Sequence, residues 1–428
     1  MTGHGVATTT DLPATDVLVV GGGVAGLASA LALLRAGRTV RLIEARTLGS
    51  GASHGNCGTL TPSHAPPLAA PGTVLKALKW MLTPDAPLYV HPGFDPALWR
   101  WLMRFALRCN HRDWERSARA KHAILEHSLQ RIRAWVDELA LDCGFHDSGE
   151  DYVFRTQKLF EHDQREFPLL RELGVQVEAI DGRTYESMEP ALKPGIAGAI
   201  RFNGDSMLRP DRYVDELARN VRALGGQIHE SCALSGLQQG SLGWEIEAGG
   251  VRFAARNVVI AAGSWSPLLA RMLGTGWLSG LIQPGKGYSI TYSRPQRTPR
   301  HPIILRERSV CVTTWGDGYR LGSTMEFSGY DDSLNPRRLT ALERGAREYL
   351  HDPVGPEVQE RWCGWRPMCV DDVPLIGAVP GRPGLWLATG HGMMGVGMSA
   401  GTGELIADLV CGRPTHLDPA AYAPARFA

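Results

Sequence analysis

Residues 16–44 read DVLVVGGGVAGLASALALLRAGRTVRLIE, and this stretch decides the fold. Its first five residues, Asp16–Val20, form a short β-branched run that is typical of a buried parallel strand. Gly21–Gly26 then matches the pattern G-x-G-x-x-G, and alanines and leucines keep helical spacing after it. A second apolar run, Thr39–Ile43, ends at Glu44. Strand, glycine turn, helix, strand and acid in this order predict a Rossmann-type dinucleotide site.

Each part of this motif has a physical task. Gly21 makes the tight turn, Gly23 admits the pyrophosphate, and Gly26 lets the helix approach the strand. The helix N-terminus offers free N–H groups and a positive partial charge to the phosphates. Glu44 is placed to accept hydrogen bonds from the adenosine ribose, and its charge disfavours a 2′-phosphate. The predicted contacts are Gly21, Gly22, Gly23, Val24, Ala25, Gly26, Glu44, Ala45 and Arg46.

Composition excludes several other classes of protein. The 428 residues carry 45 Lys plus Arg against 44 Asp plus Glu, so the chain lacks the basic excess of a nucleic-acid binder. Eight scattered cysteines without a CxxC indicate free thiols in a reducing compartment, and no metal-ligand spacing is present, so no metal is expected. The first twelve residues do not form a signal peptide, and glycines interrupt the apolar run Val17–Leu34. We therefore expect a soluble, cytoplasmic protein.

A second glycine-rich stretch lies near the C-terminus. Gly390–Gly395 follows the apolar strand Leu385–Thr389 and precedes a helix over residues 397–410. Because no second strand or terminal acid follows, this is not another dinucleotide fold. The helix N-terminus is instead expected to face the N1–C2=O edge of a flavin, with a merely packed terminal helix as the alternative. The predicted contacts are Gly392, Met393, Met394 and Gly395.

A third fragment also favours a flavin. Arg256–Ile260 is an apolar strand that runs into Ala261, Ala262 and Gly263, and such small residues let a backbone pass close to a cofactor. Ala262 and Gly263 are therefore predicted contacts. These fragments span nearly the whole chain, so we expect a discontinuous cofactor domain. An enzyme that binds only NAD would not need its last helix at the same site.

Further motifs identify a family resemblance. The chain resembles the D-amino-acid oxidase superfamily of flavoproteins, and within it the bacterial D-amino-acid dehydrogenases of the small-subunit type. The motifs run in family order from about residue 16 to residue 410. They are Ser53–Thr59 (SHGNCGT), Ala65–Gly72 (APPLAAPG), Leu75–Met81 (LKALKWM), Pro284–Ser289 (PGKGYS), Gly364–Met368 (GWRPM), Asp372–Gly377 (DVPLIG) and Thr389–Gly392 (TGHG).

The resemblance implies non-covalent FAD and oxidation of an amino acid at Cα, a step of amino-acid catabolism. Hydride would pass to flavin N5, and the imino acid would hydrolyse to a 2-oxo acid and ammonia or persist as a cyclic imine. It also implies that Asn56 and Gly58 lie along the isoalloxazine and that Ala233 lies near the adenine.

The expected fold is α/β: a Rossmann-like FAD-binding domain with a parallel sheet, and an α+β substrate domain on an antiparallel sheet. The FAD-binding domain is expected to take residues 14–85, 186–272 and 357–428. The substrate domain is expected to take residues 86–185 and 273–356. Strand-like Gly287–Tyr292 supports the antiparallel sheet, and a helical segment is expected over residues 96–141.

Three side chains are candidates for catalysis. Arg366 is the predicted carboxylate clamp, because its planar fork matches a carboxylate; a structural ion pair is the alternative. Tyr288 is predicted to donate to the same carboxylate, or else to pack on a strand. His54 is predicted to bind the amine or steer its protonation, with a polar loop residue as the alternative. His391 is expected to shape the flavin pocket. Lys286 is expected either to reach a water beside the flavin or to be solvated.

The chain departs from the dehydrogenase pattern at two segments that are expected to border the substrate, residues 64–68 (HAPPL) and 149–154 (GEDYVF). D-proline or a hydroxy-D-proline is therefore a candidate substrate beside other D-amino acids. Oxidation of a secondary amine such as sarcosine or an L-proline derivative is the alternative enzyme reaction. A non-catalytic electron-transfer flavoprotein is the alternative from another class.

An amphipathic stretch suggests how electrons could leave. Apolar residues gather on one predicted helical face, Lys76 and Lys79 lie on the other, and more apolar residues follow. Such a face suits peripheral contact with the inner face of the cell membrane and transfer to a quinone, although another carrier is equally compatible. A helix packed on the core is the alternative. The apolar residues are Val74, Leu75, Leu78, Met81, Leu82, Trp99, Trp101, Leu102 and Phe105.

Overall fold

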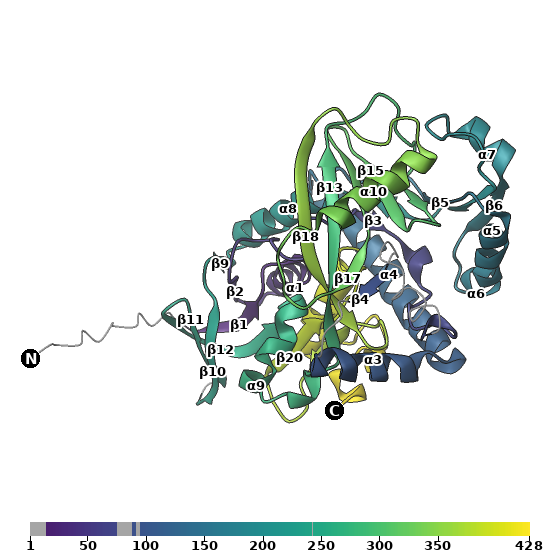
Figure 1. The fold of residues 1–428 in the computed structure, drawn as a ribbon. Helices are drawn as coiled ribbons and strands as arrows, with labels where there is room; N and C mark the ends of the chain where they lie inside the picture. The colour runs from purple at the N-terminus through teal and green to yellow at the C-terminus, as the bar shows by residue number, and fades with distance from the viewer. Residues whose placement is uncertain (1–13, 75–87, 91–94, 242) are drawn as a thin grey trace, which may run out of the picture.

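The computed structural model describes residues 14–74, 88–90, 95–241 and 243–428 (Figure 1). The first of its two large sheets has a parallel centre in the order β20-β12-β1-β2-β9. These strands confirm the apolar runs predicted at both ends of the chain. Their bounds are β1 Thr15–Val20, β2 Val40–Ile43, β9 Gln227–His229, β12 Val251–Ile260 and β20 Leu385–Thr389.

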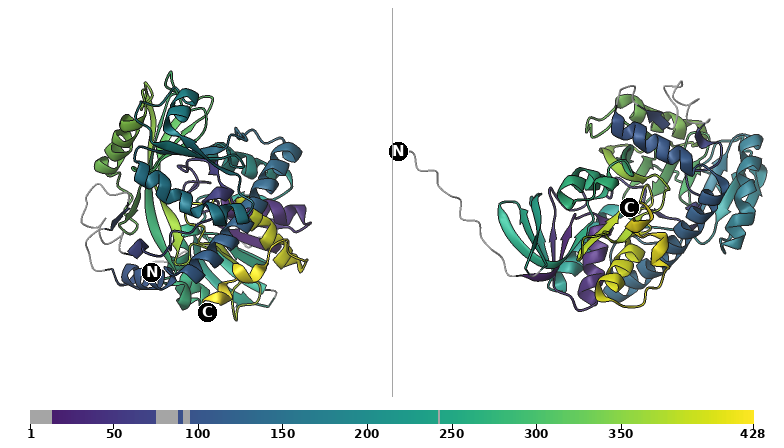
Figure 2. Two further views of the ribbon diagram at one scale, coloured as in Figure 1. Left: turned by 90° about the vertical axis from the view of Figure 1, so that its right-hand side faces the viewer. Right: turned by 90° about the horizontal axis from the view of Figure 1, so that it is seen from below.

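Helices from distant parts of the chain cover this sheet (Figure 2). The central helix α1 (Val24–Arg35) packs against α11 (Ser399–Cys411) and α8 (Pro210–Ala223), and α11 packs against α4 (His111–Leu139). Antiparallel strands extend the sheet: β10 (Leu234–Gly240) and β11 (Gly243–Ala248) beside β12, and β19 (Leu375–Ala378) beside β20. The two ends of the chain therefore share one apolar core.

The second sheet is mixed and largely antiparallel, as the sequence predicts. Its order is β4-β17-β13-β16-β15-β14-β5-β7-β6, and β18 pairs with the other side of β13. The bounds are β4 Leu88–Val90, β5 Glu150–Phe154, β6 Val177–Asp181, β7 Gly198–Phe202, β13 Ile282–Tyr292, β14 Ile303–Leu305, β15 Val310–Thr314, β16 Tyr319–Gly322, β17 Met325–Phe327 and β18 Val358–Cys369.

Helix α10 (Pro336–Tyr349) packs on one face of the second sheet. Because side chains alternate along a strand, β13 sends Tyr288 and Tyr292 toward this helix and turns Gly287 and Ser289 to the opposite face. The remaining short elements are β3 Thr59–Leu60, β8 Ser206–Met207, α3 Pro96–Arg108, α5 Gln157–Asp163, α6 Phe167–Glu172, α7 Gly182–Met188 and α9 Ala270–Leu273.

Strand pairing shifts three segments relative to the predicted domain boundaries. β7 and β18 fall in ranges assigned to the FAD-binding domain, yet both pair within the second sheet. Conversely, α4 falls in the substrate range but packs on α11. The expected helical segment over residues 96–141 is also two helices, because Asn110 interrupts it and caps α4 by accepting a hydrogen bond from Asp113 N–H.

Within the described ranges, no helix combines the length and the apolar character needed to cross a bilayer.

A buried ion pair fastens α4 to the loop after β18. Lys121 Nζ lies 2.6 Å from Asp372 Oδ2, and the two side chains are 4% and 6% exposed. Asp372 Oδ2 also accepts a hydrogen bond from Leu68 N–H at 3.1 Å. Replacing Lys121 by methionine leaves this carboxylate buried without its cation, so we expect the free energy of unfolding to fall by about 3–5 kcal/mol.

Urea unfolding measures this loss, and the same helix offers a matched control. Arg119 pairs with Glu115 at 2.8 Å, but both side chains are largely exposed. Arg119→Ala should therefore cost less than about 1 kcal/mol. Equal losses in the two variants would contradict the assigned importance of the Lys121–Asp372 pair.

Candidate active site

A cavity of about 390 Å³ lies at the ends of the parallel strands, where the three predicted glycine-rich segments meet. It is lined from both ends of the chain and from the middle, as expected for a discontinuous cofactor domain. The predicted cofactor contacts that line it are Gly21, Gly23, Val24, Ala25, Glu44, Ala45, Arg46, Asn56, Ala233, Ala262, Gly263, Gly392, Met393 and Gly395.

The start of α1 is an open anion site. Gly23 is its N-cap, no side chain caps that residue, and the first turn contains no acidic residue. Apart from Val24 N–H, the N–H groups of this first turn are free, within the described residues, to attract phosphate oxygens, so this end fits the pyrophosphate of FAD. Ser53 Oγ, which was not a predicted site residue, accepts a hydrogen bond from Val24 N–H at 3.2 Å.

Two glycines of the motif shape the turn without lining the cavity. Gly22 N–H donates to Glu44 Oε2 at 2.7 Å, while Glu44 Oε1 accepts from Arg46 N–H at 2.9 Å. A Cβ on Gly26 would overlap the carbonyl oxygen of Gly21. Gly26 therefore allows the close approach of α1 that the sequence predicts, and a direct contact of either glycine with the cofactor stays a prediction.

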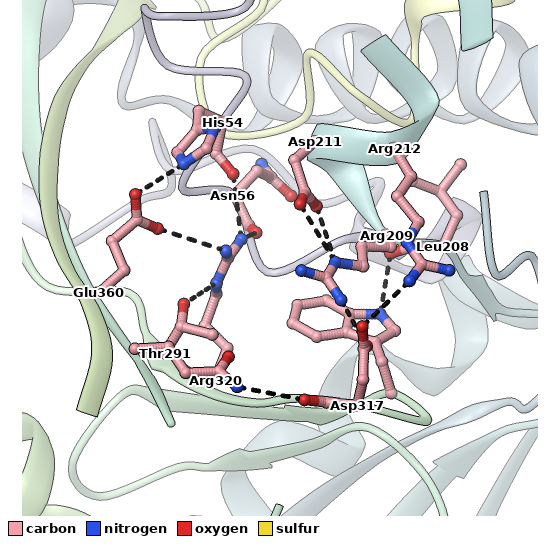
Figure 3. Close-up of polar contacts among 12 residues, drawn as sticks. His54, Asn56, Leu208, Arg209, Asp211, Arg212, Thr291, Asp317, Arg320 and Glu360 are labelled. Atoms are coloured by element: carbon pink, nitrogen blue, oxygen red, sulfur yellow. Dashed lines mark hydrogen bonds and ion pairs between the residues drawn. The ribbon is translucent and has the colours of Figure 1, made fainter. Parts of the chain in front are cut away.

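The loop directly before β3, residues 53–58, is held by the buried side chain of Arg320 (Figure 3). Arg320 is 2% exposed and donates to the carbonyl oxygens of His54 at 3.0 Å and Asn56 at 2.7 Å. Its Nε donates to Thr291 Oγ1 at 2.9 Å. Arg320 therefore positions the loop that carries Asn56, and the sequence offered no local signal for it.

Asn56 joins this loop to the C-terminal glycine-rich loop. Its Nδ2 donates to the Met393 carbonyl at 3.4 Å, and its Oδ1 accepts from Gly58 N–H at 2.7 Å. Gly58 does not line the cavity: it has a φ of +80°, and a Cβ there would overlap the Leu208 carbonyl. Met394 does not line the cavity either, because its side chain is buried in the core, and its contact with the cofactor stays a prediction.

His391 lines the same cavity and is buried. Its Nε2 lies 2.9 Å from Thr402 Oγ1 on α11. Burial lowers the pKa of His391 from 6.5 to about 4, so the ring is neutral at pH 7. The expected role of His391 in shaping the pocket stays a prediction, and a neutral ring suits it.

This pKa predicts a pH effect on stability. Below pH 6.5 the unfolded chain binds a proton at His391 that the folded chain does not bind until about pH 4. Lowering the pH from 7 to 5 should therefore cost roughly 2 kcal/mol through this residue. Urea unfolding at both pH values should show a smaller pH-dependent loss for His391→Asn than for the wild type; parallel losses would refute this.

Arg366 lines the cavity beside the glycine-rich loops, on the face of the second sheet opposite α10. Its Nη1 donates to the Thr324 carbonyl at 2.7 Å. No carboxylate pairs with it in the described part of the chain, and burial lowers its pKa. Gly287 makes the space, because a Cβ there would overlap the guanidinium. The alternative of a structural ion pair is therefore not what the structure shows.

The structure does not bring Tyr288 to this site. Tyr288 lies on the α10 face of β13, where its hydroxyl donates to Glu326 Oε2 at 3.2 Å. Lys286 lies on the same face, fully buried, and donates to the Ser333 carbonyl at 2.6 Å and Asp331 at 3.1 Å. Strand alternation explains both corrections: only the odd-numbered residues of this part of β13 face Arg366.

His54 is not among the residues that line the cavity. Its Nε2 lies 2.7 Å from Glu360 Oε1 at a half-exposed position (Figure 3). The hydrogen bond to Glu360 raises the pKa of His54. This geometry gives His54 a role in holding the loop, and its contact with the substrate amine stays a prediction.

Two tryptophans that were not predicted from the sequence form an aromatic side of the cavity. Trp265 and Trp365 both line it, with ring centroids 5.6 Å apart in an edge contact, and the Arg46 guanidinium lies 5.1 Å from the Trp265 ring. Trp265 directly follows the small residues predicted to approach the cofactor, which is a signal that could have been used.

Outside the cavity, the fold assembles possible metal ligands that sequence spacing did not indicate. Nitrogen and oxygen atoms of His127, Glu404 and His416 lie within 4.8 Å of one another. All three have protein partners: His127 Nε2 is 2.8 Å from Glu404, Arg131 is 2.5 Å from Glu404, and His416 is 3.3 Å from Asp408. These pairs account for the group as an ion network.

The fold and the cavity together are those of a two-domain oxidoreductase that binds a dinucleotide cofactor. Comparison with known proteins agrees. A family model described as DAO, FAD dependent oxidoreductase, matches residues 16–409. A D-amino acid dehydrogenase of Granulibacter bethesdensis is 32% identical over 419 residues, covering 96% of this chain and 99% of the relative. One of Agrobacterium fabrum is 31% identical over 421 residues, covering 96% and 100%. The chain belongs to this family of FAD-dependent oxidoreductases.

Solved structures share the fold. Glycine oxidase from Geobacillus kaustophilus superposes with a TM-score of 0.76 at 24% identity, covering 96% of this chain and 98% of that one. L-proline dehydrogenase from P. horikoshii gives a TM-score of 0.72 at 18% identity, covering 97% and 98%. At this identity they support the two-domain fold and not a substrate.

Proposed function

We propose that the protein is an FAD-dependent dehydrogenase of D-amino acids, with D-proline or a hydroxy-D-proline among its substrates. The observation that carries the proposal is Arg366, a half-buried arginine that lines the cofactor cavity and lacks a carboxylate partner within the described ranges. A substrate carboxylate would complete it. The names of the curated relatives support the reaction class.

Bound FAD would supply the hydride acceptor. Arg366 would hold the carboxylate so that the Cα–H bond is correctly directed, and this positioning would provide most of the rate enhancement. The Cα–H bond breaks, a C=N bond forms, and the amine nitrogen loses a proton to solvent. The described cavity lining contains no strong base near Arg366, which agrees with a substrate that reacts as its neutral amine.

Anaerobic mixing of the purified holoprotein with matched D- and L-amino acids tests this function. D-amino acids, with D-proline or a hydroxy-D-proline among them, should bleach the flavin absorbance band. Bleaching by L-proline or sarcosine alone would instead support the secondary-amine alternative. A flavin that no amino acid bleaches would favour the electron-transfer alternative and overturn the proposal.

We also propose that a membrane quinone is the electron acceptor, reached through α3. Trp99, Met103 and Leu107 repeat every fourth residue on one stripe of this helix and are 47%, 61% and 76% exposed. Exposed Arg100 and Arg104 flank them, as in helices that bind anionic lipid surfaces.

Other residues of the predicted membrane face do not belong to this stripe. Trp101 is buried and donates from Nε1 to the Met368 carbonyl at 2.8 Å, while its ring stacks on Phe105. Residues 75–82 lie outside the described residues. Flotation with anionic vesicles should be lost in a Trp99→Ser, Leu107→Ser double variant; unchanged flotation, or none in the wild type, would contradict membrane contact.

A further inference from the structure

One face of the second sheet joins Arg366 to the two segments that depart from the dehydrogenase pattern. Paired residues of neighbouring strands point to the same face. Residues an even number of positions apart on one strand also share a face. Arg366 lies four residues after Trp362, which pairs with Ser289, so Arg366 and Ser289 share a face. Glu150 lies two residues before Tyr152 and shares its face, and a row of paired residues connects Tyr152 to Ser289 across the sheet. The row, with one residue from each strand, is Ser289, Gly322, Cys311, Ile304 and Tyr152.

This face of the second sheet is turned toward the loop of residues 53–58. A Cβ on Gly322 would meet Cys57 Sγ at 2.5 Å, so Cys57 of the loop lies directly over the row. The pKa of the Cys57 thiol is lowered chiefly by its hydrogen bond with Cys311, and it responds to Arg366 and Glu150 in opposite directions. Cys57 therefore lies within the electrostatic reach of both charged groups.

Glu150 is the unexplained group on this face. It is 0% exposed, and neither carboxylate oxygen accepts a hydrogen bond from the described residues. His64 Nε2 lies 2.8 Å from Oε2, at ion-pair distance but out of line for a hydrogen bond. Leaving buried carboxylate oxygens without hydrogen bonds is costly, and a bound ligand that donates hydrogen bonds to them would remove that cost.

The neighbouring acid shows what a structural carboxylate looks like in this sheet. Asp151, on the opposite face of β5, accepts two hydrogen bonds from Arg201 at 2.8 and 2.7 Å and one from Tyr185 at 2.7 Å. Its charge and its oxygens are fully used by the fold. Glu150 is equally buried but accepts no such hydrogen bonds from the described residues.

The surroundings of Glu150 favour a hydrogen-bond donor as the partner. Burial raises the pKa of Asp205 well above its ordinary value, and Glu150 raises it further. The Tyr152 ring lies 5.4 Å from the His64 ring. The Ser63 N–H and hydroxyl donate to Asp205, which fixes the backbone next to His64. The site thus offers acceptor oxygens in a rigid frame.

We propose that Glu150 and His64 form a subsite for a hydrogen-bond donor on the substrate, remote from the carboxylate that Arg366 holds. The inference rests on the proposed function and narrows its substrate class to D-amino acids that carry a hydroxyl or an ammonium group beyond Cβ. A ring hydroxyl and a side-chain ammonium offer the same donor chemistry, and experiment separates them.

Two matched substrate pairs test the subsite with the FAD-loaded enzyme and an artificial electron acceptor. They are 4-hydroxy-D-proline against D-proline, and D-lysine against D-norleucine. In the wild type, the donor-bearing member of one pair should have a kcat/KM at least about tenfold higher. Glu150→Gln and His64→Gln should each reduce this ratio toward one, while the donor-free member changes less than about threefold.

Ligand binding separates failure of the subsite from failure of the proposed reaction. Hexanoate and 6-aminohexanoate, or cyclopentanecarboxylate and its 3-hydroxy derivative, can be titrated against the flavin spectrum without turnover. A preference for the donor-bearing acid that Glu150→Gln abolishes supports the subsite even if no amino acid reduces the flavin. Absence of any preference in the wild type, or a preference unchanged in both folded variants, would overturn it.

Discussion

Replacing Arg366 by leucine is expected to lower kcat/KM for D-amino acids by a factor of about 10²–10³ while FAD stays bound. Arg366 lines the cavity beside the cofactor loops, and its hydrogen-bond partner among the described residues is the Thr324 carbonyl. Losing one partner of a buried charge pair costs about 2–5 kcal/mol, or a factor of roughly 30 to 5,000 in rate, and the expected range lies within it. Steady-state kinetics with an artificial acceptor measure the effect, and the visible spectrum reports the bound FAD.

Two further variants make this result specific. Arg366→Lys keeps the charge but loses the planar fork, so its kcat/KM should fall less than that of Arg366→Leu and its KM should rise. Arg347→Ala removes a largely exposed arginine of α10, on the other side of the second sheet, and should leave kcat/KM unchanged. An Arg366→Leu enzyme with full activity would remove the basis of the proposed function.

Local sequence predicted those parts of the site that depend on local backbone geometry. The glycine turn, the strand before it and Glu44 are contiguous, so their spacing alone indicates the cofactor motif. The same holds for Ala262 and Gly263, which follow directly after β12 and line the cavity. In each case the residues that touch the cavity are neighbours of an apolar run that is easy to identify.

Side-chain direction was harder to predict. Tyr288 stands in a motif that borders the site, yet strand alternation turns it toward α10, and neighbouring Gly287 faces Arg366 instead. If the alternation of side chains along the strand is inferred with an error of one residue, every side chain is assigned to the wrong face. The sequence of β13 is apolar or small at most positions, so its pattern alone did not show which face is which.

Long-range partners were beyond sequence reasoning. Arg320 supports the His54 and Asn56 carbonyls from a strand more than 260 positions away, and Glu360 approaches His54 from another. Such pairs carry no spacing signal. The departures at His64 and Glu150 could be noticed separately in the sequence, but only the fold shows that they meet at 2.8 Å.

The second large effect is expected from Gly26→Ala, which should yield protein without FAD. The added Cβ would overlap the Gly21 carbonyl oxygen and approach the Ala261 side chain, so α1 cannot keep its distance from the turn. Gly21 itself has a φ of +114°, and its turn sets the direction of the helix N-terminus toward the cavity. Displacing that turn removes the aligned N–H groups that the pyrophosphate requires.

The flavin-to-protein absorbance ratio measures this loss, and we expect less than about one tenth of the wild-type FAD content. Gly204→Ala is the matched control, because nothing lies within 4 Å of a Cβ at that position, and it should keep its FAD. Addition of excess FAD distinguishes two causes. Partial recovery would indicate a distorted but folded turn, whereas no recovery together with a lowered Tm would indicate that close packing of α1 on the turn is required for the fold. Full FAD content in Gly26→Ala would show that the turn can yield, and would contradict the role assigned to this glycine.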